Sequence, residues 1–149
     1  MGFCYAFSGI LQAIKNEGHL RFHIMIAVLI SIFAYFYGIN RLEWAVLLLS
    51  IGLVIGAELL NTAIERAVDT ATDEIKPSAK FAKDASAGAV LVFAIVSVLV
   101  GICLFGNIEK IGITLTKIFT TPKILLPCLA VGVGLLIFTI FGGKNDKKI

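Results

Sequence analysis

A stripe of acidic and amide side chains in the middle of the chain has residue types that suit a hard metal ion. It consists of Glu58, Asn61, Glu65 and Asp69. An α-helix turns about 100° per residue, so these four side chains would fall within an arc of roughly 80°. Carboxylates at this spacing, with no basic residue in the stripe, repel one another. A shared Mg²⁺ would remove the repulsion, because Mg²⁺ binds through one or two carboxylates together with substrate phosphates.

Glu58 is the member of the stripe that lies closest to the apolar part of the chain. It directly follows the apolar segment Trp44–Ala57, which places its carboxylate at or just below a membrane surface. An ionisable group at that depth is costly and therefore predicts a function. The alternative is that Glu58 extends to the lipid headgroups without any chemical role.

Two further polar clusters are expected at the same membrane depth. Lys83 and Asp84 come just ahead of another apolar segment. Lys83 can bind phosphate as a point charge, and Asp84 can orient that lysine or the metal. The alternative is an ordinary interfacial lysine beside an acid in the first part of a helix. The third cluster precedes and begins the first apolar segment and contains Asn16, Glu17, Arg21 and His23. His19 and His23, each taken alone, favour a structural or interfacial role.

Together the clusters supply carboxylates for a metal, a cation for phosphate and a carboxylate at lipid depth. This combination predicts phosphoryl transfer from MgATP to a lipid hydroxyl, with Glu58 accepting or orienting the hydroxyl proton. The sequence has neither a G-x-x-x-x-G-K-[ST] loop nor the protein-kinase motifs, so ATP must be bound in another way. A different class of function is a small proton-coupled transporter with four helices, in which Glu58 carries the proton. Carboxylates gathered at one surface rather than at the midplane argue against it.

The composition predicts that an all-α integral membrane protein positions these residues. The chain has 149 residues, of which 58% are hydrophobic and 15% charged, with a mean hydropathy of +0.96. A water-exposed surface does not tolerate this composition, which excludes an ordinary soluble enzyme. Four segments approach the roughly 20 apolar residues that cross a bilayer core of about 30 Å. They are Phe22–Ile39, Trp44–Ala57, Gly88–Gly106 and Ile124–Phe141.

The helices are expected to extend beyond these spans. Helical periodicity continues from the second span through Val68, and Pro77 suits the first turn of a helix that enters the third span. At the N-terminus, apolar residues from Phe3 to Ile14 recur at helical spacing, which predicts an amphipathic helix on the membrane surface. Packing of that helix on protein is the alternative. The connection Asn107–Lys123 has a similar pattern and is expected to lie along the outer surface.

The distribution of Lys and Arg predicts the orientation of the chain. With the N-terminus inside, the inner segments hold Lys15, Arg21, Arg66, Lys76, Lys80, Lys83, Lys144, Lys147 and Lys148. The outer segments hold only Arg41, Lys110, Lys117 and Lys123. Both termini and the polar clusters are therefore expected on the cytoplasmic side. The net charge is only +3 and the basic residues form no continuous patch, so nucleic-acid binding is not expected.

The motifs resemble a known family. The segment Glu58-Leu-Leu-Asn61-Thr-Ala-Ile-Glu65, with Val68-Asp69 and Ala82-Lys83-Asp84 after it, is similar to the signature of the small prokaryotic membrane lipid kinases, which act on diacylglycerol or undecaprenol. Asn16-Glu17 ahead of Arg21 also matches. The resemblance covers about residues 2–107, and residues 1–107 are expected to form the kinase core. Residues 108–149 depart from it and are expected to form an outer connection, an extra fourth span and a basic cytoplasmic tail.

The resemblance implies an activity, cofactors and an assembly. It implies a homotrimer in the plasma (inner) membrane, with three core spans and a surface helix per subunit and with sites shared between subunits. ATP and Mg²⁺ would be used to phosphorylate a lipid alcohol. Glu58 would be the general base, Glu17 and Glu65 the metal ligands, and the nucleotide or phosphate contacts would be Asn61, Asp69, Lys83 and Asp84. His23, common at this place in undecaprenol-specific members, favours undecaprenol over diacylglycerol as the acceptor.

Overall fold

A computed structural model describes residues 2–71 and 76–143, and in these ranges every regular element is a helix. The helices are α1 (Gly2–Asn16), α2 (Gly18–Tyr37), α3 (Arg41–Ala71), α4 (Pro77–Leu104), α5 (Ile108–Thr120) and α6 (Pro122–Phe141). Four of them, α2, α3, α4 and α6, are long and apolar enough to cross a membrane, which confirms the predicted all-α membrane fold. The basic tail predicted for residues 144–149 lies outside the described ranges.

Local sequence signals explain where the helices begin and end. Gly38 ends α2 in the left-handed conformation, with a φ of 74°, and its N–H donates to the carbonyl oxygen of Ala34. The next helix is started by Asn40, whose Oδ1 accepts from the backbone N–H of Leu42, while the carboxylate of Glu43 accepts from the N–H of Asn40. This reciprocal pair is a capping box and makes the turn between α2 and α3 short and rigid.

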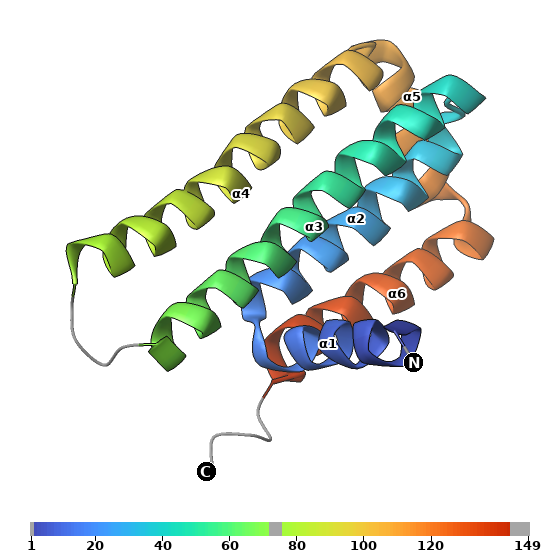
Figure 1. Ribbon diagram of the computed structural model, residues 1–149. Helices are drawn as coiled ribbons and strands as arrows, with labels where there is room; N and C mark the ends of the chain where they lie inside the picture. Colours follow the sequence, from blue (N-terminus) through green and yellow to red (C-terminus); the bar gives the residue numbers. More distant parts are fainter. Residues whose placement is uncertain (1, 72–75, 144–149) are drawn as a thin grey trace.

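The long helices lie side by side, with the two short helices at opposite ends of the molecule (Figure 1). Helix α3 makes its most extensive contact with α4, while α2 packs against both α3 and α6. Among the described helices, α4 contacts only α3. Helix α1 contacts α2 and α3 at the end where α3 finishes and α4 starts, and α5 contacts α2 and α6 at the other end. The predicted polar clusters therefore belong to the α1 end.

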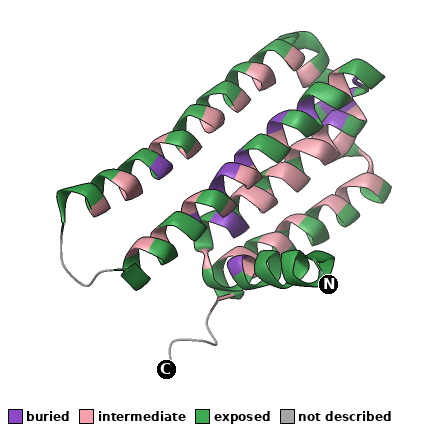
Figure 2. Ribbon diagram, in the orientation of Figure 1, coloured by how far each residue is buried: buried purple, intermediate pink, exposed green. Residues whose placement is uncertain are grey.

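The tightest packing lies at the α5 end, away from these clusters. There Ala34 and Tyr37 of α2, Leu47 of α3 and Phe105 after α4 form a buried cluster. The ring of Phe105 lies edge-on to that of Tyr37, with centroids 5.1 Å apart. Figure 2 shows buried residues concentrated on α2 and α3, whereas α4 and α6 are mostly exposed. In a membrane protein such apolar exposed faces are covered by lipid or by another subunit.

Helix α1 has the features predicted for a surface helix. Its aromatic residues Phe3, Tyr5 and Phe7 are exposed, and only Ala13 is buried. Its contacts with α2 and α3 are few compared with those between the long helices. An amphipathic helix with an exposed aromatic face is suited to lie in the interface of a bilayer.

Candidate active site

The carboxylate of Glu58 is buried on α3 and contacts the imidazole of His23 on α2. The Nε2 atom of His23 lies 3.0 Å from Oε1 of Glu58, and the two side chains are 23% and 9% exposed. Glu58 follows directly on Ala57, which is also buried. A buried carboxylate is tolerated only when a polar partner compensates for its lost hydration. The structure thus gives His23 a partner that the sequence alone did not indicate.

A second group of contacts links α3 to α4 one turn further along. The amide of Asn61 donates to Oε1 of Glu65 at 3.1 Å. The hydroxyl of Ser86 lies 2.6 Å from Oδ1 of Asn61 and 2.9 Å from the carbonyl oxygen of Lys83, and its one proton is donated to one of them at a time. Ser86 is buried. The amide of Asn61 is therefore held in one orientation, with its oxygen toward α4 and its nitrogen toward Glu65.

A third contact lies near the connection between α3 and α4, at the exposed end of the site. The ammonium of Lys83 lies 2.7 Å from Oδ1 of Asp69. Lys83 precedes the apolar part of α4, and its hydrogen bond with Asp69 raises the pKa of the ammonium group, which stays charged at neutral pH. Asp84 is exposed and has no partner among the described residues. Asp69 therefore orients Lys83 in the structure, whereas Asp84, which was expected to orient either the lysine or the metal, does not contact the lysine.

The fourth contact joins the start of α2 to α3. Oε1 of Glu17, the residue between α1 and α2, lies 3.3 Å from Nη2 of Arg66. Arg66 follows Glu65 on α3, so the Glu17 carboxylate approaches the helix turn that carries Glu65. Two carboxylates from different elements match the one or two protein ligands that Mg²⁺ ordinarily takes. Within the described ranges, His, Cys, Asp and Glu side chains form no cluster of three that could hold a metal by themselves.

These contacts correct one part of the sequence argument. The acidic stripe was expected to repel itself unless a cation was shared, because no basic residue is interleaved within it. In the structure, basic side chains reach its members from other helices: His23 of α2 contacts Glu58, and Lys83 of α4 contacts Asp69. Each of these two carboxylates therefore has a partner, since neighbouring helices supply side chains that one helix's sequence does not reveal.

The contacts of three residues were missed by sequence reasoning. His23 was placed in the third polar cluster and linked to the acceptor lipid through the family resemblance, but it was not paired with Glu58. Arg66 was counted only as a topology signal, and Ser86 was not considered. A signal existed for Ser86, because it lies one turn after Lys83 and so shares a face of α4 with it. No comparable signal pairs His23 with Glu58, since that contact depends on how α2 is placed against α3.

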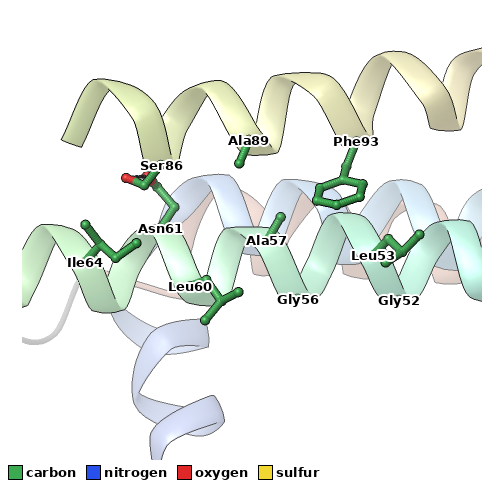
Figure 3. A pocket seen from close by; sticks show the side chains of 10 residues that line it. All are labelled: Gly52, Leu53, Gly56, Ala57, Leu60, Asn61, Ile64, Ser86, Ala89 and Phe93. Atoms are coloured by element: carbon green, nitrogen blue, oxygen red, sulfur yellow. Dashed lines mark hydrogen bonds between the residues drawn. The ribbon is translucent and has the colours of Figure 1, made fainter. Parts of the chain in front are cut away.

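Two apolar grooves reach the site. One of about 480 Å³ lies between α3 and α4; its walls include Leu53, Leu60 and Phe93, and Asn61 and Ser86 form its polar end (Figure 3). The other, of about 390 Å³, is lined by α2, α3 and α4, and His23 is on its wall. Helices α2 and α4 both pack against α3, and this second groove lies between the three helices. Each groove leads from the apolar part of the helices toward polar site residues.

The fold and site define a helical membrane protein with a polar, carboxylate-rich site at one end of its spans. The chain matches the family described as prokaryotic diacylglycerol kinase over residues 4–105. It belongs to this family and is a lipid kinase, an enzyme that uses ATP as co-substrate. This membership removes the transporter alternative and leaves α6 outside the matched segment.

Similar proteins carry two different names. A protein of Bacillus subtilis (strain 168) named undecaprenol kinase is 42% identical over 103 residues, covering 69% of this chain and 84% of that protein. A protein of Synechocystis sp. named diacylglycerol kinase is 40% identical over 105 residues, covering 70% of this chain and 60% of that protein. The diacylglycerol kinase of Escherichia coli (strain K12) is 32% identical over 95 residues, covering 64% of this chain and 78% of that protein. No solved structure gives a significant match to the chain.

Proposed function

We propose that this kinase transfers the γ-phosphoryl group of ATP to undecaprenol in a single in-line step. The hydroxyl oxygen of the lipid forms a bond to phosphorus as the bond to the β-phosphate oxygen breaks. ADP leaves with that electron pair, and the hydroxyl proton moves to the carboxylate of Glu58. The observation that carries this proposal is the buried Glu58 carboxylate held by His23, which itself lines an apolar groove. A lipid chain in that groove brings its polar end to the carboxylate.

The nucleotide is assigned to the exposed side of the same site. Exposed ion pairs contribute little to stability, so the Asp69–Lys83 pair opens easily and Lys83 can bind a phosphate oxygen. Asn61, held by Ser86 and Glu65, presents a fixed amide to the nucleotide. Asp84 is exposed and available for a further polar contact.

Glu17 and Glu65 are proposed to hold Mg²⁺. Each carboxylate has one oxygen in a hydrogen bond with a protein donor, Arg66 for Glu17 and Asn61 for Glu65. Such bonds leave the other oxygen to a metal and fix the direction in which it points. Bound Mg²⁺ would neutralise charge that develops on the phosphates during transfer.

Undecaprenol is favoured over diacylglycerol as the acceptor. The relative named undecaprenol kinase is similar over 84% of its own length, while the one named diacylglycerol kinase in Synechocystis is covered over 60%. A groove with apolar walls accepts a long isoprenoid chain without specific polar contacts. Diacylglycerol, which would give phosphatidic acid, is the alternative acceptor.

We also propose that the site faces the cytoplasm of the plasma membrane and is shared between subunits of a homotrimer. The predominance of Lys and Arg at the α1 end supports this orientation. The exposed apolar faces of α4 and the open grooves beside α3 support an assembly in which another subunit covers part of the site.

The test is a kinase assay on the detergent-solubilised full chain. Undecaprenol and diacylglycerol are offered separately at matched mole fractions in the same micelles, with ATP and Mg²⁺, and labelled lipid phosphate is measured. We expect undecaprenol to give the higher kcat/KM. A clear preference for diacylglycerol would reverse the acceptor assignment, and phosphorylation of neither lipid would contradict the proposed function.

A further inference from the structure

Arg21, in the first part of α2, is a buried cation whose hydrogen bonds all go to helix ends. Arg21 as a whole residue is only 6% exposed. Nη1 donates to the carbonyl oxygens of Ile14 at 2.9 Å and Lys15 at 2.8 Å, and Nε donates to that of Thr139 at 3.3 Å. Within the described ranges, no carboxylate pairs with it.

These acceptors belong to the last turns of two different helices. Ile14 and Lys15 end α1, and Thr139 lies near the end of α6. Carbonyl groups in the last turn of a helix have no partner within the helix and carry partial negative charge. Arg21 therefore stabilises two helix ends at once and joins them. One of the two is the helix that lies outside the family match.

The chain after α6 passes very close to this guanidinium. A Cβ atom on Gly143 would lie 2.6 Å from Nη2 of Arg21 and 3.0 Å from the carbonyl oxygen of Lys15. Both distances are too short for a side chain unless its neighbours move. The hydroxyl of Thr139, which lies 2.8 Å from the carbonyl oxygen of Leu135, is also 3.6 Å from the sulfur of Met25 on α2. The end of α6 is thus fitted against the junction of α1 and α2.

The junction held in this way carries Glu17. Glu17 is the single residue between α1 and α2, two positions after Lys15, whose carbonyl group Arg21 binds. Its carboxylate is oriented by Arg66, and its backbone position depends on how the end of α1 is held. We propose that Arg21 is a positioning residue for Glu17. By holding Arg21 in place, α6 then helps to fix the position of Glu17 in the catalytic site. This inference depends on the proposed function, in which Glu17 binds the metal.

The experiment crowds Arg21 from the α6 side without touching the proposed site residues. Gly143→Val places a side chain against the guanidinium, whereas the matched control Gly134→Val, on an exposed face of α6, meets nothing within 4 Å. Arg21→Lys is a second variant, which keeps the charge but loses the fork that binds two helix ends. If Gly143→Val does not fold, Gly143→Ala and Arg21→Lys replace it.

Two measurements are made on full-length protein in detergent. The first is amide hydrogen exchange of residues 14–19 without nucleotide, which we expect to be faster in Gly143→Val and Arg21→Lys and unchanged in Gly134→Val. The second is the Mg²⁺ concentration for half-maximal kinase activity, which we expect to rise about tenfold in the first two variants, as for other residues that orient metal ligands. Saturating Mg²⁺ should restore most of the turnover.

The outcomes separate this inference from the proposed function. Unchanged exchange in both variants would overturn the link between α6 and the junction. Faster exchange with an unchanged Mg²⁺ requirement would overturn the positioning role. Failure of the proposed function would appear differently, as wild-type protein that phosphorylates no lipid, or as Glu17→Gln protein whose Mg²⁺ requirement equals that of the wild type.

Discussion

Replacing Glu58 by glutamine tests the proton acceptor without removing the packing around it. Glutamine has nearly the same shape as glutamate, and its amide can still form a hydrogen bond with Nε2 of His23. The variant should therefore fold normally. It loses the negative charge and the ability to accept a proton.

The expected loss follows from the environment of the carboxylate. A positioned proton acceptor contributes a factor of about 10² to 10⁴ in rate, which corresponds to roughly 3–5.5 kcal/mol. The side chain of Glu58 is only 9% exposed, so bulk water has little access to take its place. We expect turnover of Glu58→Gln to fall by a factor in the upper half of this range, about 10³ to 10⁴.

The assay measures kcat at saturating lipid and ATP, together with the Kd for MgATP by calorimetry. The matched control is Glu43→Gln, the same change at the distant start of α3, where glutamine can still accept the N–H of Asn40. We expect the control to keep normal turnover and both variants to keep normal MgATP affinity. Near-normal turnover in Glu58→Gln would refute the reasoning, and a loss confined to MgATP binding would assign Glu58 to the nucleotide instead.

Three more predictions concern the residues around Glu58. Glu65→Gln should lower the affinity for ATP in the presence of Mg²⁺ and leave the affinity for ATP without Mg²⁺ unchanged. Calorimetry with and without EDTA measures both affinities, and an equal fall in the two would contradict this prediction. Ser86→Ala removes the hydroxyl that holds Asn61, so we expect a loss of about 1 kcal/mol in unfolding free energy and a raised KM for ATP; an unchanged KM would show that Asn61 does not need this support. If each site is formed by two neighbouring subunits, mixed oligomers of Glu58→Gln subunits and Asp69→Asn subunits should regain partial activity, because some sites would contain neither substitution. Mixed oligomers that are confirmed by differential tags but have no activity would indicate that each site is built within one chain.

The elements of this fold were predictable because hydropathy and helical periodicity act within one segment. The four spans, the surface helix and the helix in Asn107–Lys123 are all present. The first residues of the helices were predicted less accurately. The first span was predicted from Phe22, but α2 begins at Gly18. Its first turn is polar, so hydropathy alone does not detect it. The stripe on α3 could be predicted for the same reason, because one helix fixes which side chains share a face.

The pairing of the site residues could not be predicted in this way. Sequence spacing determines the face of a helix but not the helix opposite it, so the contacts of Glu58 with His23 and of Glu17 with Arg66 had no signature. Arg21 is an extreme case. All of its acceptors are backbone carbonyl groups, which every residue possesses, and one of them is 118 positions away in the chain.

The cluster around Phe105 also shapes the groove beside His23. It ties α2, α3 and the end of α4 together at one end of the molecule. Leu47, a buried member of this cluster, belongs to the wall of the groove, and so do Ile30 and Ile51, which pack against the cluster. The packed core and the groove therefore have side chains in common. A substitution that changes the size of one of these side chains changes the packing of the core and the shape of the groove together, so the two cannot vary independently in evolution.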